Sequence, residues 1–293
     1  MNRANFGCSA LLAASLLCTG CPGERTVQIG LPPRNVDEAV SRVNSNADRI
    51  RGAIRAPSLV SFTFRDGDGG KRRFLGYQAM LLFRPERCLR FEVRSLTGVI
   101  AEFGSNDERY WMWIEPEVRK LWWGSWAHAG DVSTKKLPIS ASDLLDALAL
   151  NPLPERAIDG LRPVLRSEGD DHRLVFNRLG EDGEIAGVRE IRVQSSPPYQ
   201  PIEIVDRDNN SRVLMRAQLG NYERIGESGP FTPRKYAVVW PVAEAELRID
   251  VQSVKMSPDL AEFCEFPDRW SGAIEPLDPP TEVGSIAPRR SAP

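Results

Sequence analysis

The sequence of 293 residues has little of what most enzymes use for chemistry. It contains two histidines, His128 and His172, and neither stands in a metal-binding spacing such as H-E-x-x-H. It also lacks a G-x-S-x-G nucleophile motif, a phosphate-binding P-loop and a dinucleotide-binding glycine pattern. The sequence therefore predicts no catalytic residue, no cofactor and no metal ligand, and we expect that the protein is not an enzyme.

Two acidic stretches, 66–70 and 206–210, are faintly similar to calcium loops. An EF-hand loop needs a glutamate at its twelfth position, which here is Tyr77 or Ala217. Asp, Asn and Gly also supply the backbone angles of tight turns, so both stretches are interpreted as hairpin turns.

Long hydrophobic runs and an excess of one charge are missing as well. The apolar run from Cys8 to Cys18 is about eleven residues long, whereas a membrane-spanning helix needs about 20. The 38 basic and 40 acidic residues are well mixed, so no basic face for a nucleic-acid partner is indicated.

The first residues fit a targeting segment. Arg3, the short apolar run and the small residues before Cys21 are typical of a secretory signal peptide over residues 1–20. The ending Leu17-Cys18-Thr19-Gly20-Cys21 resembles a bacterial lipobox, although Cys18 stands where leucine is usual. This resemblance implies cleavage before Cys21, a lipid on its thiol and anchoring in the cell envelope. An ordinary signal peptide with an incidental cysteine is the alternative.

Residues 21–34 follow as the lipidated cysteine and a tether that is rich in proline and glycine. Pro22 stands after the cysteine, where an aspartate favours the inner membrane in enteric bacteria. We therefore expect the outer membrane, with the protein facing the periplasm.

The rest of the chain is expected to fold as one helix, six strands, a second helix and then seven more strands. Apolar residues at three- and four-residue steps predict a helix from Val36 until Pro57, with Asn35 as its cap and Glu38 completing a capping box. Period-two segments predict six strands over 58–66, 73–83, 88–93, 98–104, 109–115 and 118–126. A second helix is expected over 140–150, followed by strands over 161–168, 172–178, 188–194, 200–207, 211–222, 235–242 and 246–256.

The short turns between the first six strands predict an antiparallel meander. The fold class is α+β: a strongly curved antiparallel sheet with two helices covering its concave face. We expect one folded domain over residues 35–265 and a disordered tail over 266–293. Cys88 and Cys264 could pair in an oxidising periplasm or could be two buried thiols.

This order of elements resembles the LolA/LolB-like superfamily. The resemblance is carried by the segment 84–93 (RPERCLRFEV) and by 110–116 (YWMWIEP), which ends in a proline turn. It implies a half-open barrel with a hydrophobic cavity that holds acyl chains, and an anchored member that accepts lipoproteins at the outer membrane. The protruding apolar loop of the acceptor has no clear counterpart in this sequence, and Trp122, Trp123 and Trp126 are the candidates for it.

The expected activity is non-covalent binding of a lipid or a lipoprotein acyl chain. Side chains alternate along a strand, so inward-facing apolar positions would line the cavity. The candidates are Phe62, Phe64, Leu81, Phe83, Leu89, Phe91, Val93, Trp111, Trp113, Leu144 and Leu148. The alternative is that the same residues form a filled core in a scaffold lipoprotein that docks an envelope protein. The expected partners are thus the membrane, a lipid or acylated lipoprotein, and possible envelope proteins.

Overall fold

A computed structural model describes residues 33–65, 69–85, 87–114, 119–129, 139, 141–154, 161–168, 171–180, 183–257, 263–267 and 273–277. The expected signal peptide, Cys21 and nearly all of the tether lie outside these residues. Within them, no helix is both long enough and apolar enough to cross a membrane.

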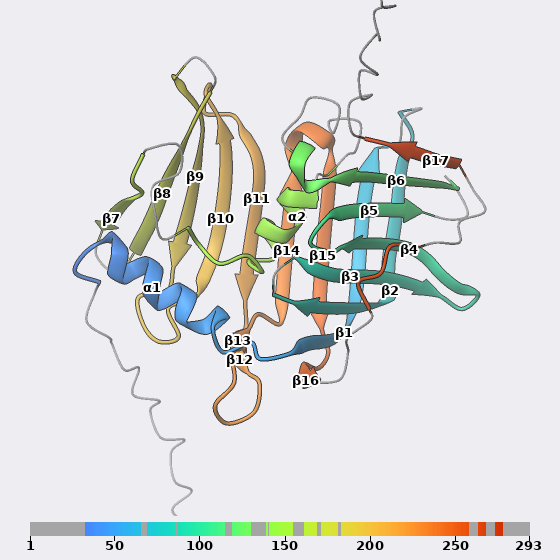
Figure 1. The fold of residues 1–293 in the computed structure, drawn as a ribbon, viewed down its shortest axis with the longest axis horizontal. Coiled ribbons are helices and arrows are strands. Elements are labelled where there is room, and N and C mark those ends of the chain that lie inside the picture. Colours follow the sequence, from blue (N-terminus) through green and yellow to red (C-terminus); the bar gives the residue numbers. More distant parts are fainter. Residues whose placement is uncertain are drawn as a thin grey trace, which may run out of the picture.

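The described elements are mostly strands, with two α-helices (Figure 1). The helices are α1 (Val36–Ala47) and α2 (Ala141–Ala147). The strands of the first half are β1 (Ala53–Arg65), β2 (Lys71–Arg84), β3 (Cys88–Ser95), β4 (Gly98–Ser105), β5 (Arg109–Ile114) and β6 (Lys120–Ser125). Those of the second half are β7 (Val164–Glu168), β8 (Asp171–Leu179), β9 (Ile185–Val193), β10 (Pro201–Asp208), β11 (Val213–Gly220), β14 (Lys235–Trp240) and β15 (Ala245–Val251). Shorter strands are β12 (Glu223–Arg224), β13 (Phe231–Thr232), β16 (Lys255–Ser257) and β17 (Ala273–Pro276).

One open sheet joins fifteen strands in the order β17-β6-β5-β4-β3-β2-β1-β15-β14-β11-β10-β9-β8-β7, with β16 on β1. Its pairs are antiparallel except β17 with β6. The meander β1–β6 and the later strands meet where β1 pairs with β15, for example Val60 opposite Ile249. In Figure 1 strands β3 to β6 run across the direction of β1 and β2. The predicted antiparallel sheet, its two helices and the α+β class are therefore confirmed, and the sheet is not closed.

Helix α1 begins as predicted and ends earlier. The side chain of Asn35 accepts from the backbone N–H of Glu38, and Glu38 accepts from that of Arg34, as in a capping box. The helix ends at Ala47, so the prediction that it continues until Pro57 is wrong. Pro57 lies inside β1, between the stretches that pair with β16 and with β15, where its missing N–H leaves no ladder bond unmade.

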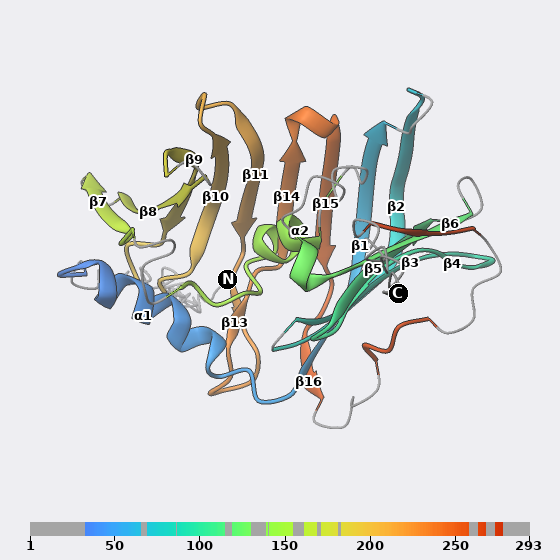
Figure 2. The ribbon, with the colours of Figure 1, turned by 45° about the horizontal axis from the view of Figure 1, so that its top comes forward.

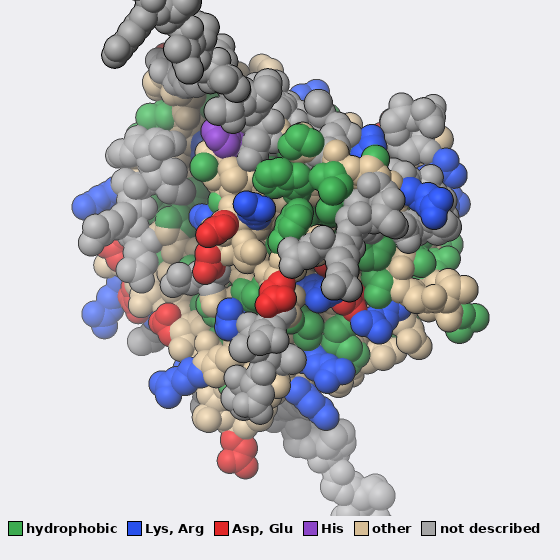
Figure 3. Space-filling model, turned by 45° about the vertical axis from the view of Figure 1, so that its right-hand side comes forward, with side chains coloured by type: hydrophobic (Ala, Val, Ile, Leu, Met, Phe, Trp, Pro, Cys, Tyr) green, Lys and Arg blue, Asp and Glu red, His purple; other side chains and the backbone are tan. Residues whose placement is uncertain are grey.

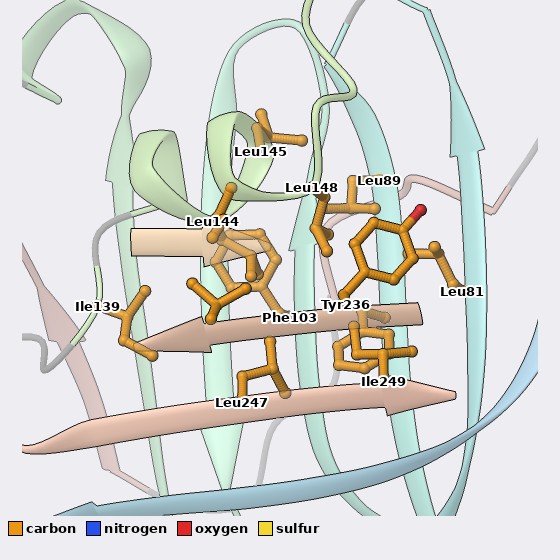
Figure 4. Packing of buried hydrophobic residues seen from close by; sticks show 14 of the residues in the cluster. Leu81, Leu89, Phe103, Ile139, Leu144, Leu145, Leu148, Tyr236, Leu247 and Ile249 are labelled. Carbon is orange, nitrogen blue, oxygen red and sulfur yellow. The ribbon is translucent and has the colours of Figure 1, made fainter. Parts of the chain in front are cut away.

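Both helices pack on the same face of the sheet (Figures 1 and 2). Helix α1 contacts β7 and β8, and α2 contacts β11. In Figure 4, Leu144 of α2 points toward Phe103, and Leu148, just after the helix, points toward Leu89 and Tyr236. This inner face of the sheet carries one continuous hydrophobic core.

The opposite, outer face of the second half is a solvated surface of charged side chains. Arg173 pairs with Glu190 at 3.6 Å, and Glu203 receives Arg192 at 3.5 Å and Arg216 at 3.8 Å from the two flanking strands. Cross-strand pairs of opposite charge stabilise a sheet modestly. The alternation predicted for these strands thus separates an apolar face from a charged one.

The expected disordered tail over 266–293 is wrong for residues 273–277. Ala273–Pro276 form β17 beside β6, and Leu277 is buried. The backbone N–H and C=O groups of this short segment need hydrogen-bond partners, and the edge of β6 provides them. A local composition rich in proline and serine did not reveal this pairing.

Candidate functional site

A cavity of about 310 Å³ lies between the helices and the second half of the sheet. Phe176, Ile191 and Ile204 form its floor on strands β8, β9 and β10. Val43 and Ala47 of α1 line it on the helical side, together with the segment 148–154 that follows α2. The volume is at the lower end of the ~300–1,000 Å³ typical of ligand pockets.

Of the eleven predicted cavity residues, Leu148 alone lines this space. The others on the inner face belong to the packed core, namely Phe62, Phe64, Leu81, Phe83, Leu89, Phe91, Val93 and Leu144. Leu89 is 0% exposed and Phe83 1% exposed. Phe62 and Phe64 do share a face, with ring centroids 5.0 Å apart. These residues therefore pack against one another and do not line this cavity.

Trp111 and Trp113 point to the other face of the sheet. Their neighbours Tyr110, Met112 and Ile114 join the inner core instead. The indole of Trp111 lies against β4 at Gly104, where an added Cβ would approach the ring to 2.2 Å. Because β5 is apolar at every position from 110 to 114, period two gives no indication of which set faces inward.

Two asparagines of α1 hold the rim of the cavity by reciprocal hydrogen bonds. Asn44 donates to the carbonyl of Leu153 and accepts from its N–H, both at 2.8 Å. Asn46 does the same with Phe231, at 2.8 and 2.6 Å. Such paired bonds fix a loop to a helix more tightly than a single one, so α1 positions both the 148–154 segment and β13.

An ion cluster stands at one end of the cavity. Arg189 donates from Nε and Nη2 to the two carboxylate oxygens of Asp206, each at 2.7 Å, and its Nη1 lies 2.8 Å from Asp146 of α2. Burial alone would lower the pKa of the Arg189 guanidinium, but the hydrogen bonds and charges of both aspartates raise it above its ordinary value. The cluster therefore stays ionised and ties α2 to the sheet.

Hydroxyl groups gather at the other end. Tyr222 donates to the carbonyl of Pro201 at 2.5 Å, while the Oγ1 atom of Thr232 is buried without a hydrogen-bond partner. Tyr236 also lines the cavity. Burial raises the pKa of Tyr236, and burial followed by the proximity of Tyr236 raises that of Tyr222. Both phenols are thus neutral at physiological pH, and that of Tyr222 already donates its proton to Pro201.

The outer face of β3 to β6 is covered by the segment around Phe266. Cys264 forms a disulfide with Cys88, which settles the question that the sequence left open. Phe266 packs edge-on against Trp111 at 5.5 Å and Trp123 at 6.1 Å. Figure 3 shows hydrophobic side chains gathered on one part of this side of the molecule, among charged groups of both signs.

The residues that sequence reasoning missed are polar positions on the inner face. Arg178 and Arg189 line the cavity, and each is separated from an inward apolar residue by two positions, Phe176 and Ile191. An arginine at an inward position of an otherwise alternating strand was a usable signal. Among the described residues, no group of three His, Cys, Asp or Glu side chains could hold a metal ion.

No protein-family model matches the sequence, and no curated protein is significantly similar to it. Solved structures do resemble the fold. A DUF1329 family protein from Desulfovibrio piger matches with a TM-score of 0.51 and 13% identity, over 77% of this chain and 93% of that one.

Two further structures carry names from the superfamily that the sequence resembles. A LolA superfamily protein from Nitrosomonas europaea has a TM-score of 0.44 and 11% identity, over 78% of this chain and 95% of its own. A putative outer membrane lipoprotein-sorting protein domain from Vibrio parahaemolyticus has a TM-score of 0.43 and 9% identity, over 76% of this chain and 94% of its own. At identities of 9–13%, the likeness to these solved structures concerns the fold alone.

Proposed function

We propose that this protein binds a lipid or a lipoprotein acyl chain non-covalently and acts as a carrier or acceptor in envelope lipid trafficking. The observation that carries the proposal is the cavity between the two helices and strands β8 to β10. Its apolar floor of Phe176, Ile191 and Ile204 can bury a hydrocarbon chain, at about 0.8 kcal/mol for each CH₂ removed from water. The proposal includes no step in which a bond is made or broken.

The proposal takes the sheet as a curved half-barrel whose concave side the helices cover. Loosening of α1 and of the segment 148–154 would admit the ligand, because these elements separate the cavity from solvent on that side. Asn44 holds Leu153 and Asn46 holds Phe231 by hydrogen bonds at the rim, so opening on this side would break these bonds and leave the ladders of the sheet intact.

We place the protein at the envelope through a lipid on Cys21. This part rests on the lipobox-like sequence 17–21. One acyl chain gives marginal binding, so the two or three chains of bacterial lipoproteins would be needed for a permanent anchor.

The exposed tip of the β3–β4 hairpin is the proposed membrane contact. Leu96 is fully exposed there, between Ser95 and Thr97, whose hydroxyls hydrogen-bond to each other at 2.8 Å. An apolar side chain held out on a short, ordered turn can enter the lipid interface with little loss of conformational freedom. This turn, rather than the tryptophans considered from the sequence, fits the protruding loop of an anchored acceptor.

The test is lipid recovery from the full chain carrying Cys21→Ala, purified from a bacterial host. Native mass spectra and solvent extraction should find stoichiometric lipid. Ile204→Phe narrows the cavity and should lower the bound lipid several-fold. Ile249→Phe is the matched control, because Ile249 is a buried isoleucine of the inner face that does not line the cavity.

A clean apo mass, with no lipid taken up on incubation, would contradict the carrier proposal. It would favour the second candidate, a scaffold lipoprotein that docks an envelope protein. The packed inner face of β1 to β5 is the observation that supports this candidate, since a filled core needs no ligand.

A further inference from the structure

We infer that the ligand is a single-chain anionic amphiphile whose acidic head group pairs with Arg178 and whose chain lies over Phe176, Ile191 and Ile204. The inference rests on the proposed function and adds the class of ligand and the residue that selects it. Three observations carry it: an arginine that no described residue pairs with, acidic neighbours that already have partners, and the small volume of the cavity.

Arg178 is an exposed residue near the end of β8 that lines the cavity. No described residue makes a hydrogen bond or an ion pair with its guanidinium. Opposite it on β9 stands Gly187, and a Cβ atom there would lie 3.1 Å from Nη2 of Arg178 and 2.9 Å from the carbonyl oxygen of Arg207. The missing side chain thus leaves the guanidinium room to lie across the strand.

The other charged residues of the lining are engaged. Arg189 is held by Asp206 and Asp146, and Asp146 also accepts from Asn151 at 3.0 Å. Asp143 likewise has an interaction partner. A ligand carboxylate or phosphate can therefore take Arg178 without displacing an existing ion pair, and a guanidinium binds such groups through two parallel hydrogen bonds.

The shape of the cavity favours one chain. Its lining extends from Arg178 on β8 to Tyr236 on β14, and β9, β10 and β11 lie between these strands. Four strand spacings of about 4.8 Å make a width of about 19 Å. The volume of about 310 Å³ is at the lower end of the usual range for ligand pockets, which favours a ligand with one chain over a ligand with two.

The polar groups at the far end limit the length of the chain. Thr232 carries a buried hydroxyl with no hydrogen-bond partner among the described residues, and Tyr236 also lines the cavity. A hydrocarbon end reaching these groups would leave them unpaired, whereas a shorter chain leaves room for water beside them. The geometry thus orients the ligand with its anionic end at Arg178.

The test uses the full chain carrying Cys21→Ala and the fluorescent fatty acid cis-parinaric acid. Palmitate, 1-hexadecanol and 1-palmitoyl-lysophosphatidylglycerol compete for the bound probe. The last two replace the carboxylate by a neutral hydroxyl and by a phosphate, so the palmitate and lysophospholipid arms distinguish a free acid from a lipid head group. Arg178→Gln is compared with Arg55→Gln, an exposed strand arginine that does not line the cavity.

We expect palmitate or the lysophospholipid to bind at least tenfold more tightly than hexadecanol. Arg178→Gln should remove that advantage and leave hexadecanol binding unchanged, while Arg55→Gln should change neither. Gly187→Ala places a methyl group against the guanidinium of Arg178 and should weaken binding of the anionic ligand several-fold. Equal binding of anionic and neutral chains by the original protein and by Arg178→Gln would overturn the inference and leave the proposed function standing. Failure of every chain to bind would overturn both.

Discussion

Arg189 on β9 and Asp206 on β10 face each other on the inner side of the sheet and meet through two hydrogen bonds of 2.7 Å. The carboxylate side chain of Asp206 is 4% exposed, and Asp146 of α2 approaches the same guanidinium from the helical side. A buried pair of this kind contributes little compared with an apolar pair, yet it is costly to break. Its main effect is to fix α2 and two strands at one end of the cavity.

Asp206→Ala should lower the free energy of unfolding by about 3–5 kcal/mol, because it leaves Arg189 buried with an incomplete set of partners. The double variant Arg189→Met/Asp206→Leu should recover most of this loss. Urea unfolding measures both. Asp250→Ala is the control, since Asp250 pairs with Lys235 on the exposed surface and should matter little. Equal effects of the two single variants would contradict the assignment.

Cys264→Ser should lower the free energy of unfolding by about 2–5 kcal/mol, because the disulfide closes a long loop in the unfolded chain. Cys88→Ser should do the same, and the double variant should add nothing further. The emission of Trp111 and Trp123 should shift to longer wavelength if the segment around Phe266 leaves them. An unchanged spectrum in the folded variant would mean that packing alone holds this segment.

Alkaline pH should destabilise the protein through Tyr222 and Tyr236. Their folded pKa values are raised by burial, so the unfolded state loses its phenolic protons first, near pH 10. The stabilising contribution is complete below that pH and is lost as the pH rises toward the folded pKa values. Absorbance of tyrosinate should show Tyr222 and Tyr236 ionising only as the fold opens. The double Phe variant should lack this late step.

Cys21→Ala should move the protein from the membrane to the soluble fraction, because it removes the thiol that would carry the lipid. Cys18→Ala is the control and should remain membrane-bound, because it leaves the thiol of Cys21 in place. Fractionation with metabolic labelling by a fatty acid reports both results. A Cys21→Ala protein that stays with the membrane refutes the anchor.

Leu96→Asp should weaken contact of the soluble Cys21→Ala protein with lipid vesicles, and stability should not change because the side chain is fully exposed. Leu75→Asp is the matched control: Leu75 is also exposed, 66%, but lies on β2 away from the hairpin tip. Vesicle flotation compares the two. A similar loss of vesicle binding in both variants would contradict a specific contact by the hairpin tip and would indicate nonspecific hydrophobic binding.

Local patterns were sufficient for most of the elements. Period-two segments predicted the six strands of the meander and the later strands, because a half-buried strand must alternate apolar and polar residues. The capping residues Asn35 and Glu38 marked the start of α1 correctly. Its end was missed because Ile50 and Ile54 continue the helical spacing by chance, while Ile54 in fact packs from β1.

The sequence by itself determined the α+β class, the order of helices and strands, and the apolar residues available for a core. The tertiary structure decided which of those residues meet: Trp111 turns outward because Gly104 and Phe266 make room for and cover its ring. It also decided where space remains. A cavity is the volume left over when α1, α2 and the sheet pack together, so the sequence of a single strand does not encode it. Here that volume lies beside Arg178 and not along the strands that were expected to line it.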